Sequence, residues 1–351
     1  MSGSYGRRGL ALLVVVVAAL AAGRATPAAH QTALKRLSAA GLGAGSGRVH
    51  SHLLTRTTRR LASFPSTAWG GAYTTKTGES VTIYSSSAYP VDDATNQAAA
   101  DYLDSLVHGP ELSQVRIYFA PADEVGVLCG STDADGCYSP ATGEIVSIGE
   151  DSQWSTVEEV VTHEYGHHIA AHRLNAPWPA VAWGTKRWAT YEGVCAKQAG
   201  GRAFPGDEGD HYSQNPGEAF AESFLHLNEV KLGVAETPWG YDPMFAPDAK
   251  ALAALEQDVV APWTGYSLQH WNGRFSRRGQ LGTALLRTPL DGVVALQLQG
   301  PRGSSIRLTG ALHPRRSSQT LVSGLVCGQR SVAARVTGGR AGRFQVAAAT
   351  P

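Results

Sequence analysis

A chain of 351 residues that is 43% hydrophobic and 17% charged has the composition of a packed globular protein, with one large or two ordinary domains. Its formal net charge of +1 argues against a dedicated nucleic-acid binder, which needs a basic face to displace counterions from phosphates. Only one long apolar run stands out, at the extreme N-terminus, and this pattern excludes a membrane channel.

That apolar run predicts an export signal over residues 1–29. Arg7 and Arg8 form its charged start, residues 10–22 form its apolar core, and small residues follow as cleavage sites. We therefore expect a secreted, extracellular protein with no stable membrane insertion after the signal is removed. We also expect a monomer. A retained anchor helix is the alternative, although the run is shorter than the roughly 20 residues that span a bilayer.

The next segment, residues 30–65, is rich in Ala, Gly, Ser and Arg and is interpreted as a flexible leader or short pro-segment. A hairpin is expected over residues 70–90, where alternating polar and β-branched residues flank a Thr-Gly turn. A helix follows over residues 92–109, from an acidic pair to a glycine. Buried strands are expected at residues 113–120 and 143–149.

The four cysteines agree with an oxidising compartment. Cys129 and Cys137 bracket a polar loop with Gly at both ends, which predicts a local disulfide that closes a hairpin. Cys195 and Cys327 then pair by elimination. Two free buried thiols are the alternative for this second pair.

The segment STVEEVVTHEYGHHIAAHR predicts a helix, with Ser155 as its cap and Glu158 in a capping box. On this helix His163 and His167 are four residues apart and project side by side, so two imidazole nitrogens can hold one ion. Glu164, one position round, can reach a water on that ion without ligating it. The pattern H-E-x-x-H therefore indicates a zinc site.

A catalytic zinc also needs a third protein ligand. The extended pattern with a third histidine fails, because Ala170 and Arg173 stand where it requires Gly and His. A second helix is predicted over residues 215–230, with Asn as its cap and Pro at its first position. It presents Glu218 and Glu222 on one face, so Glu218 would ligate and Glu222 would hydrogen-bond a ligand histidine.

At these motifs the chain resembles the zincin metallopeptidases, specifically the glutamate-zincin group with its thermolysin-like and lethal-factor-like members. In that group a helix bearing H-E-x-x-H precedes a helix that supplies the glutamate ligand. GEAFAESF is similar to the E-x-F-A-E segment of the lethal-factor-like branch, and the chain also looks like exported actinobacterial-type proteins that share GCY, HEYGHH and NPGEAFAE. The match, over about residues 70–275, assigns the zinc ligands His163, His167 and Glu218, the general base Glu164 and the supporting acid Glu222.

The resemblance implies an α+β zincin domain over residues 66–275, a mixed sheet with an active-site helix and a glutamate helix. It also implies a zinc-dependent endopeptidase in which the metal activates a water for attack on a peptide bond, and Glu164 takes the proton of that water. Tyr212 lies about where lethal-factor-like enzymes carry a tyrosine that stabilises the tetrahedral anion. His211 is the runner-up, and a packing tyrosine is the alternative. The strand at 143–149 would be the edge strand that pairs with an extended peptide substrate.

The last part of the chain lies outside this resemblance. Short strands separated by Gly, Pro and Ser predict a small all-β sandwich domain over residues 280–351, with nine arginines and one aspartate. This basic bias suits an anionic surface or simply a solvated face. On the zinc helix, His168 and His172 point away from the ligand face and are interpreted as structural.

Two other functions compete with the peptidase. The first is a zincin-fold surface binding module that holds zinc but is inactive. Glu164 argues against it, because that residue serves chemistry and not metal binding. The second is a cell-surface structural protein whose function lies in the β domain.

Overall fold

The computed structural model describes residues 32–47, 49–54 and 64–351. The expected export signal lies outside the described residues, and the expected leader at 30–65 is described only in part. Within these ranges, no helix is both long and apolar enough to cross a membrane.

In the described residues, a six-stranded mixed sheet has the order β1-β5-β6-β4-β3-β2. Strands β3, β4 and β6 are parallel, whereas β2 and β5 run antiparallel to β3 and β6. Strands β5 and β6 are buried along their whole length, as expected for strands covered on both faces. The strands are β1 (Ser51–Leu53), β2 (Trp69–Thr74), β3 (Ser80–Ser85), β4 (Arg116–Ala120), β5 (Gly136–Ser139) and β6 (Glu144–Ile148).

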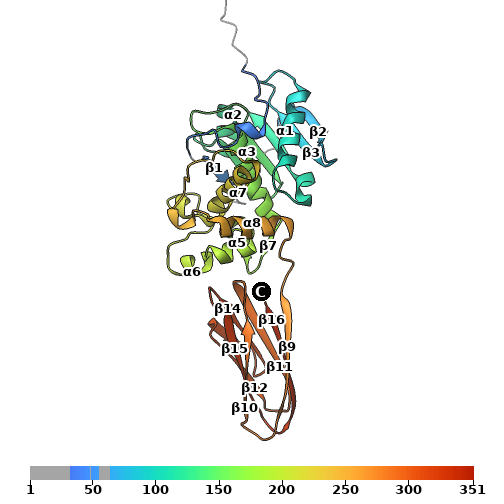
Figure 1. The fold of residues 1–351 in the computed structure, drawn as a ribbon, viewed down its shortest axis with the longest axis vertical. Helices are drawn as coiled ribbons and strands as arrows, with labels where there is room; N and C mark the ends of the chain where they lie inside the picture. The colour runs from blue at the N-terminus through green and yellow to red at the C-terminus, as the bar shows by residue number, and fades with distance from the viewer. Residues whose placement is uncertain (1–31, 48, 55–63) are drawn as a thin grey trace, which may run out of the picture. The chain divides into compact units, whose positions relative to one another are not determined.

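Helices pack on this sheet, and α3 also packs along α7 (Figure 1). The helices are α1 (Asp93–Ser105), α2 (Ala122–Cys129), α3 (Val157–Ala171), α4 (Ala180–Trp183), α5 (Lys186–Tyr191), α6 (Val194–Ala199), α7 (Pro216–Leu232) and α8 (Ala249–Val260). Short elements complete this part: β7 (Leu174–Asn175), β8 (Trp178–Pro179), and 3-10 turns η1 (Ala39–Gly41), η2 (Pro110–Gln114), η3 (Tyr212–Gln214) and η4 (Pro243–Phe245). Their apolar side chains form one continuous core with the sheet.

The predicted hairpin is confirmed as β2 and β3, and the helix predicted over residues 215–230 is confirmed as α7, capped by Asn215. The predicted capping box of α3 is wrong by one residue. Thr156 accepts a hydrogen bond from the Glu159 amide, and Glu159 accepts one from the Thr156 amide. The Glu158 carboxylate is engaged elsewhere, because it bonds Lys35 of the N-terminal segment.

Two further expectations are corrected. The strand at 143–149 is β6, which lies between β5 and β4, so it is not the edge strand. Cys129 does bond Cys137, but the bond joins the end of α2 to β5 and does not close a hairpin, because β5 forms its hairpin with β6. Helix α2 was not expected from the sequence.

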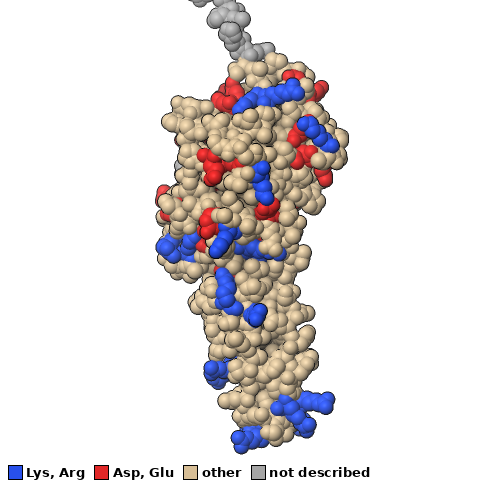
Figure 2. Space-filling view, in the orientation of Figure 1, with Lys and Arg blue, Asp and Glu red and all other residues tan. Residues whose placement is uncertain are grey.

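Two antiparallel sheets follow, with the orders β13-β14-β11-β16-β9 and β10-β15-β12. Alternate side chains point inward and form a core of their own. Residues 267–351 hold twelve arginines and one aspartate, and Figure 2 shows basic but no acidic side chains over these strands. The strands are β9 (Ser267–Phe275), β10 (Leu281–Arg287), β11 (Gly292–Gln299), β12 (Ser305–Thr309), β13 (Leu312–Arg316), β14 (Leu321–Val326), β15 (Ser331–Thr337) and β16 (Gly342–Thr350).

A second disulfide joins Cys195 on α6 to Cys327 after β14, across 132 residues of sequence. All four cysteines are therefore paired. The Asp291 amide also donates to the Thr190 hydroxyl at 3.1 Å, so a hydrogen bond supports the same connection.

The long-range disulfide gives a test on stability. Cys327→Ser is expected to lower the free energy of unfolding by about 2–5 kcal/mol, because the unfolded chain regains the freedom of a long loop. Thermal unfolding measures this loss. The double variant Cys195→Ser/Cys327→Ser controls for the thiol left unpaired in the single variant, and should lose a similar amount. Equal melting of wild type and both variants would show that the bond contributes nothing to the folded protein.

Candidate metal centre

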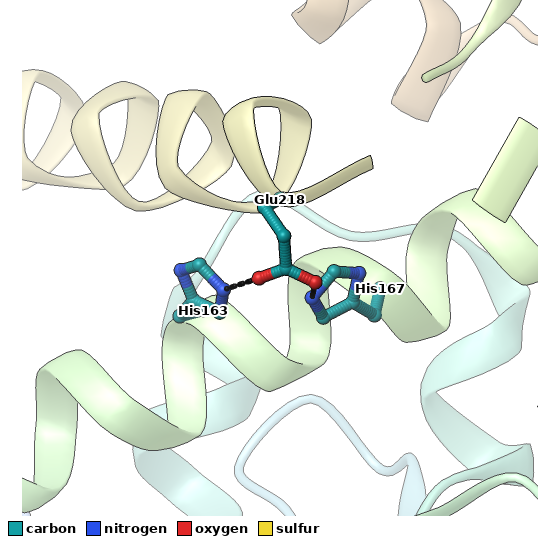
Figure 3. A group of neighbouring side chains, drawn as sticks. All are labelled: His163, His167 and Glu218. Carbon is teal, nitrogen blue, oxygen red and sulfur yellow. Dashed lines mark hydrogen bonds and ion pairs between the residues drawn. The ribbon is translucent and has the colours of Figure 1, made fainter. Parts of the chain in front are cut away.

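The candidate site lies where α3 crosses α7, and Gly166 on α3 permits their close approach. A Cβ at this position would lie 2.9 Å from Ala221 Cα and 3.1 Å from Ala221 O. Because these are backbone atoms, a side chain here would push the helices apart. The crossing brings Glu218 of α7 over His163 and His167, which lie one helical turn apart on α3 (Figure 3).

Replacing Gly166 by Ala is therefore expected to destabilise the chain by about 1–3 kcal/mol, as overpacked sites do, and to weaken metal binding. Gly71 in β2 is a matched control, because a Cβ there would meet nothing within 4 Å. Gly71→Ala should be neutral or slightly stabilising and should leave metal binding unchanged. Urea unfolding and metal titration of both variants check this prediction. Equal effects of the two substitutions would contradict the role of Gly166.

Three buried side chains converge at this crossing. His163 Nε2 lies 3.3 Å from Glu218 Oε2, and His167 Nε2 lies 3.2 Å from Glu218 Oε1. One ligand atom from each residue lies within 4.8 Å of the others, and all three side chains are fully buried. His167 Nε2 and Glu218 Oε1 complete no hydrogen bond among the described residues in spite of their short separation. Ligand atoms of a tetrahedral metal lie roughly 3.4 Å apart, so the group fits a metal ion.

Glu222, one turn beyond Glu218, orients the first histidine. Its Oε2 lies 2.9 Å from His163 Nδ1. A proton on Nδ1 is then donated to Glu222, which leaves the Nε2 lone pair directed at the centre. The structure therefore places Glu222 where a carboxylate supports a ligand histidine without entering the ligand group.

The centre stabilises positive charge between its members. Burial alone would lower the pKa of His163, but hydrogen bonds to Glu218 and Glu222 outweigh burial and raise it to about 10. Burial opposes ionisation of Glu218, yet the facing His167 and His163 hold the pKa of that carboxyl well below its usual range. A positive charge, carried by an imidazolium or by a metal ion, therefore has favourable partners here.

Glu164 lies beside this group but is not part of it. The side chain is fully buried, burial raises its pKa to about 8, and neither carboxylate oxygen has a hydrogen-bond partner among the described residues. The backbone of β5 is close, since a Cβ at Gly136 would lie 3.1 Å from Glu164 Oε1. An unpartnered buried carboxylate is costly, so burial favours the protonated form, and the side chain is placed to take up and release a proton beside the metal-binding group.

Tyr212 and His211 were the two candidates for the residue that stabilises the tetrahedral anion, and the structure brings only Tyr212 to the centre. Its hydroxyl lies 2.8 Å from Glu218 Oε2 and 3.0 Å from the carbonyl oxygen of Ser51. His211 instead stacks on Phe204 and bonds Asp207.

Sequence reasoning missed two residues of this region. The Tyr241 ring stacks on His163 with a centroid separation of 6.2 Å, and its hydroxyl lies 3.5 Å from Glu218 Oε2. Glu208 accepts from Asn215 at 2.9 Å, and burial, followed by the nearby Glu218 charge, raises its pKa. Both residues lie on loops, where no periodic pattern identifies a side chain that faces the site.

The two remaining histidines in and just after α3, His168 and His172, have structural contacts, as expected. His168 Nε2 lies 2.9 Å from the Glu111 carbonyl oxygen, and Nδ1 lies 3.2 Å from the Tyr138 hydroxyl. His172 follows the last turn of α3, with Nδ1 2.9 Å from the His168 carbonyl oxygen. Neither residue belongs to the metal-binding group.

Comparisons with protein-family models and with curated proteins give no match. Among solved structures, the chain is similar at 9% identity to the IMPa metallopeptidase from Pseudomonas aeruginosa, with a TM-score of 0.15. The alignment covers 77% of this chain and 41% of that one, so this chain spans less than half of its length. At this TM-score the likeness carries no argument about fold or activity.

Proposed function

We propose that the chain is a secreted zinc metalloendopeptidase of the glutamate-zincin type. The observation that carries this proposal is the buried group of His163, His167 and Glu218, with Glu164 beside it and outside the ligand set. Two imidazoles and one carboxylate form a common ligand set for catalytic zinc, which keeps a further position open. The two disulfides support an oxidising location outside the cytoplasm.

Each residue of the site has a proposed role. Zinc, when bound by His163, His167 and Glu218, would polarise the scissile carbonyl and acidify a water. Glu164 accepts the proton and returns it to the leaving amine. Tyr212 donates to the oxygen on which negative charge develops.

The second candidate is a module that holds metal without turnover. The buried, unpartnered carboxylate of Glu164 favours the enzyme, because a purely structural metal site gains nothing from an ionisable group beside the ligands. The proposed substrate is a protein or peptide, the proposed oligomeric state is a monomer, and no nucleic acid takes part.

Metal analysis combined with digestion of a peptide library tests the proposal. The experiment uses the full chain and its Leu53→Ala variant. This substitution shortens a buried side chain of β1, the strand whose Ser51 carbonyl oxygen contacts Tyr212. We expect one zinc per chain and new peptide termini that disappear with a chelator and return with zinc. Bound zinc without cleavage by either protein would favour the binding module, and absence of metal from both would contradict both candidates.

A further inference from the structure

The proposed catalytic centre is closed to solvent. His163, Glu164, His167 and Glu218 have no exposed surface. A protein or peptide substrate must nevertheless reach these side chains. Some part of the described chain therefore covers the position that a substrate would take.

The covering segment consists of residues 49–54, which contain β1. Strand β1 pairs in parallel with β5, with Ser51 opposite Gly136 and Leu53 opposite Tyr138. Beyond the ladder, the Asp135 amide donates to the His50 carbonyl at 2.8 Å. The segment thus forms main-chain hydrogen bonds with β5, the strand that packs on α3, as a peptide added to a sheet edge would do.

The covering segment also contacts the proposed catalytic groups. The Ser51 carbonyl oxygen lies 3.0 Å from the Tyr212 hydroxyl, and the Ser51 side chain approaches Glu164 without completing a hydrogen bond of good geometry. The Leu53 amide donates to Glu208 Oε2 at 3.2 Å. A backbone carbonyl of this chain therefore occupies the place beside Tyr212 that the proposed function assigns to a substrate carbonyl.

A cavity of about 350 Å³ adjoins this contact, lined in part by His50, Ser51, His52, Glu208 and Tyr212. Residues of the covering segment form one wall of it. Displacement of the segment would therefore extend this space toward the buried centre. The outer edge of β5 would then be free to pair with another extended peptide.

We propose that the outer edge of β5 is the peptide-binding groove and that residues 49–54 occupy it as an internal, substrate-like strand that inhibits the enzyme. This inference rests on the proposed peptidase function. Because β1 runs parallel to β5, and parallel pairing is slightly less stable per residue than antiparallel pairing, an antiparallel substrate strand has an advantage in displacing it.

Apolar anchors hold the covering segment in place. The exposed fractions of Val49, Leu53 and Leu54 are 1%, 3% and 7%. Upstream, the Gly45 amide donates to Glu159 Oε1 at 2.7 Å. Shortening a leucine within residues 49–54 should therefore raise the fraction of open molecules without touching the catalytic side chains.

Leu53→Ala tests the inference, with Leu34→Ala as its matched control. Leu34 is another buried leucine of the same N-terminal region, with an exposed fraction of 8%, but it lies seventeen residues before β1. If the full chain is mostly closed, Leu53→Ala should cleave a peptide at least about tenfold faster, because the rate follows the fraction of competent molecules. Leu34→Ala should match wild type, and only Leu53→Ala should speed hydrogen exchange at the Asp135 amide.

A labelled synthetic peptide of residues 49–54 gives a readout that does not need activity. It should bind the zinc-loaded Leu53→Ala protein and inhibit it competitively, and it should bind the full chain far more weakly. Leu54→Ala replaces Leu53→Ala if the latter fails to fold.

The outcomes separate the two proposals. Peptide binding without any hydrolysis by either protein would support the groove and its occupant while the peptidase proposal fails. Failure of the peptide to bind a variant with fast exchange at Asp135 would overturn the inference. Equally fast cleavage by the full chain and the variant would overturn it as well.

Discussion

Replacement of Glu164 by Gln is expected to leave the metal bound and the chain folded, while peptide hydrolysis falls by about 10²–10⁴-fold. The amide keeps the shape of the side chain but cannot accept a proton. Glu164 lies outside the ligand group and has no hydrogen-bond partner among the described residues, so the substitution breaks neither a ligand bond nor a hydrogen bond. The rate of peptide cleavage is measured in the Leu53→Ala background if that variant cleaves faster than the full chain.

The matched control is Glu256→Gln on α8, which removes a partly exposed carboxylate paired with Lys231. This variant should keep both metal and activity. Metal content and circular dichroism separate loss of chemistry from loss of the site. Cleavage by Glu164→Gln at the wild-type rate would remove Glu164 from the mechanism, and loss of its metal would move Glu164 into the ligand group.

The part of the site that the sequence predicts is the part with a local signal. His163 and His167 are four residues apart on a helix, and the Asn-Pro start sets the beginning of α7. These two helices and their inward side chains follow from periodicity and capping. Ser155 and Thr156 are both good caps, and tertiary contacts decide between them, because the Glu158 carboxylate bonds Lys35 and the Ser155 hydroxyl bonds Asp135.

The covering strand could not be predicted in this way. Strand β1 (Ser51–Leu53) has only three residues. It is a strand only because it pairs with β5, which lies more than eighty residues later in the chain. The strand at 143–149 was expected at the edge from the family resemblance, and nothing local in a sequence indicates which neighbours a strand will have. Tyr241 and Glu208 likewise reach the centre from loops through tertiary packing alone.

The two α7 carboxylates, Glu218 and Glu222, are expected to contribute very unequally to zinc affinity. Glu218→Ala should weaken zinc binding far more than Glu222→Ala, for which losses of about 10–100-fold are typical of a group that supports a ligand. The reason is geometric. The two carboxylate oxygens of Glu218 lie 3.3 Å from His163 Nε2 and 3.2 Å from His167 Nε2. Glu222 instead bonds Nδ1, the other ring nitrogen of His163.

Zinc titration against a competing chelator measures this ranking, and Glu229→Ala on the same helix is the control. Glu229 is buried and bonds Thr237, away from the metal group, so its loss should lower stability without changing zinc affinity. Equal losses for Glu218→Ala and Glu229→Ala would mean that α7 has merely loosened. The reverse ranking of Glu218 and Glu222 would make Glu222 the ligand, and α7 would then have to shift by one turn along α3.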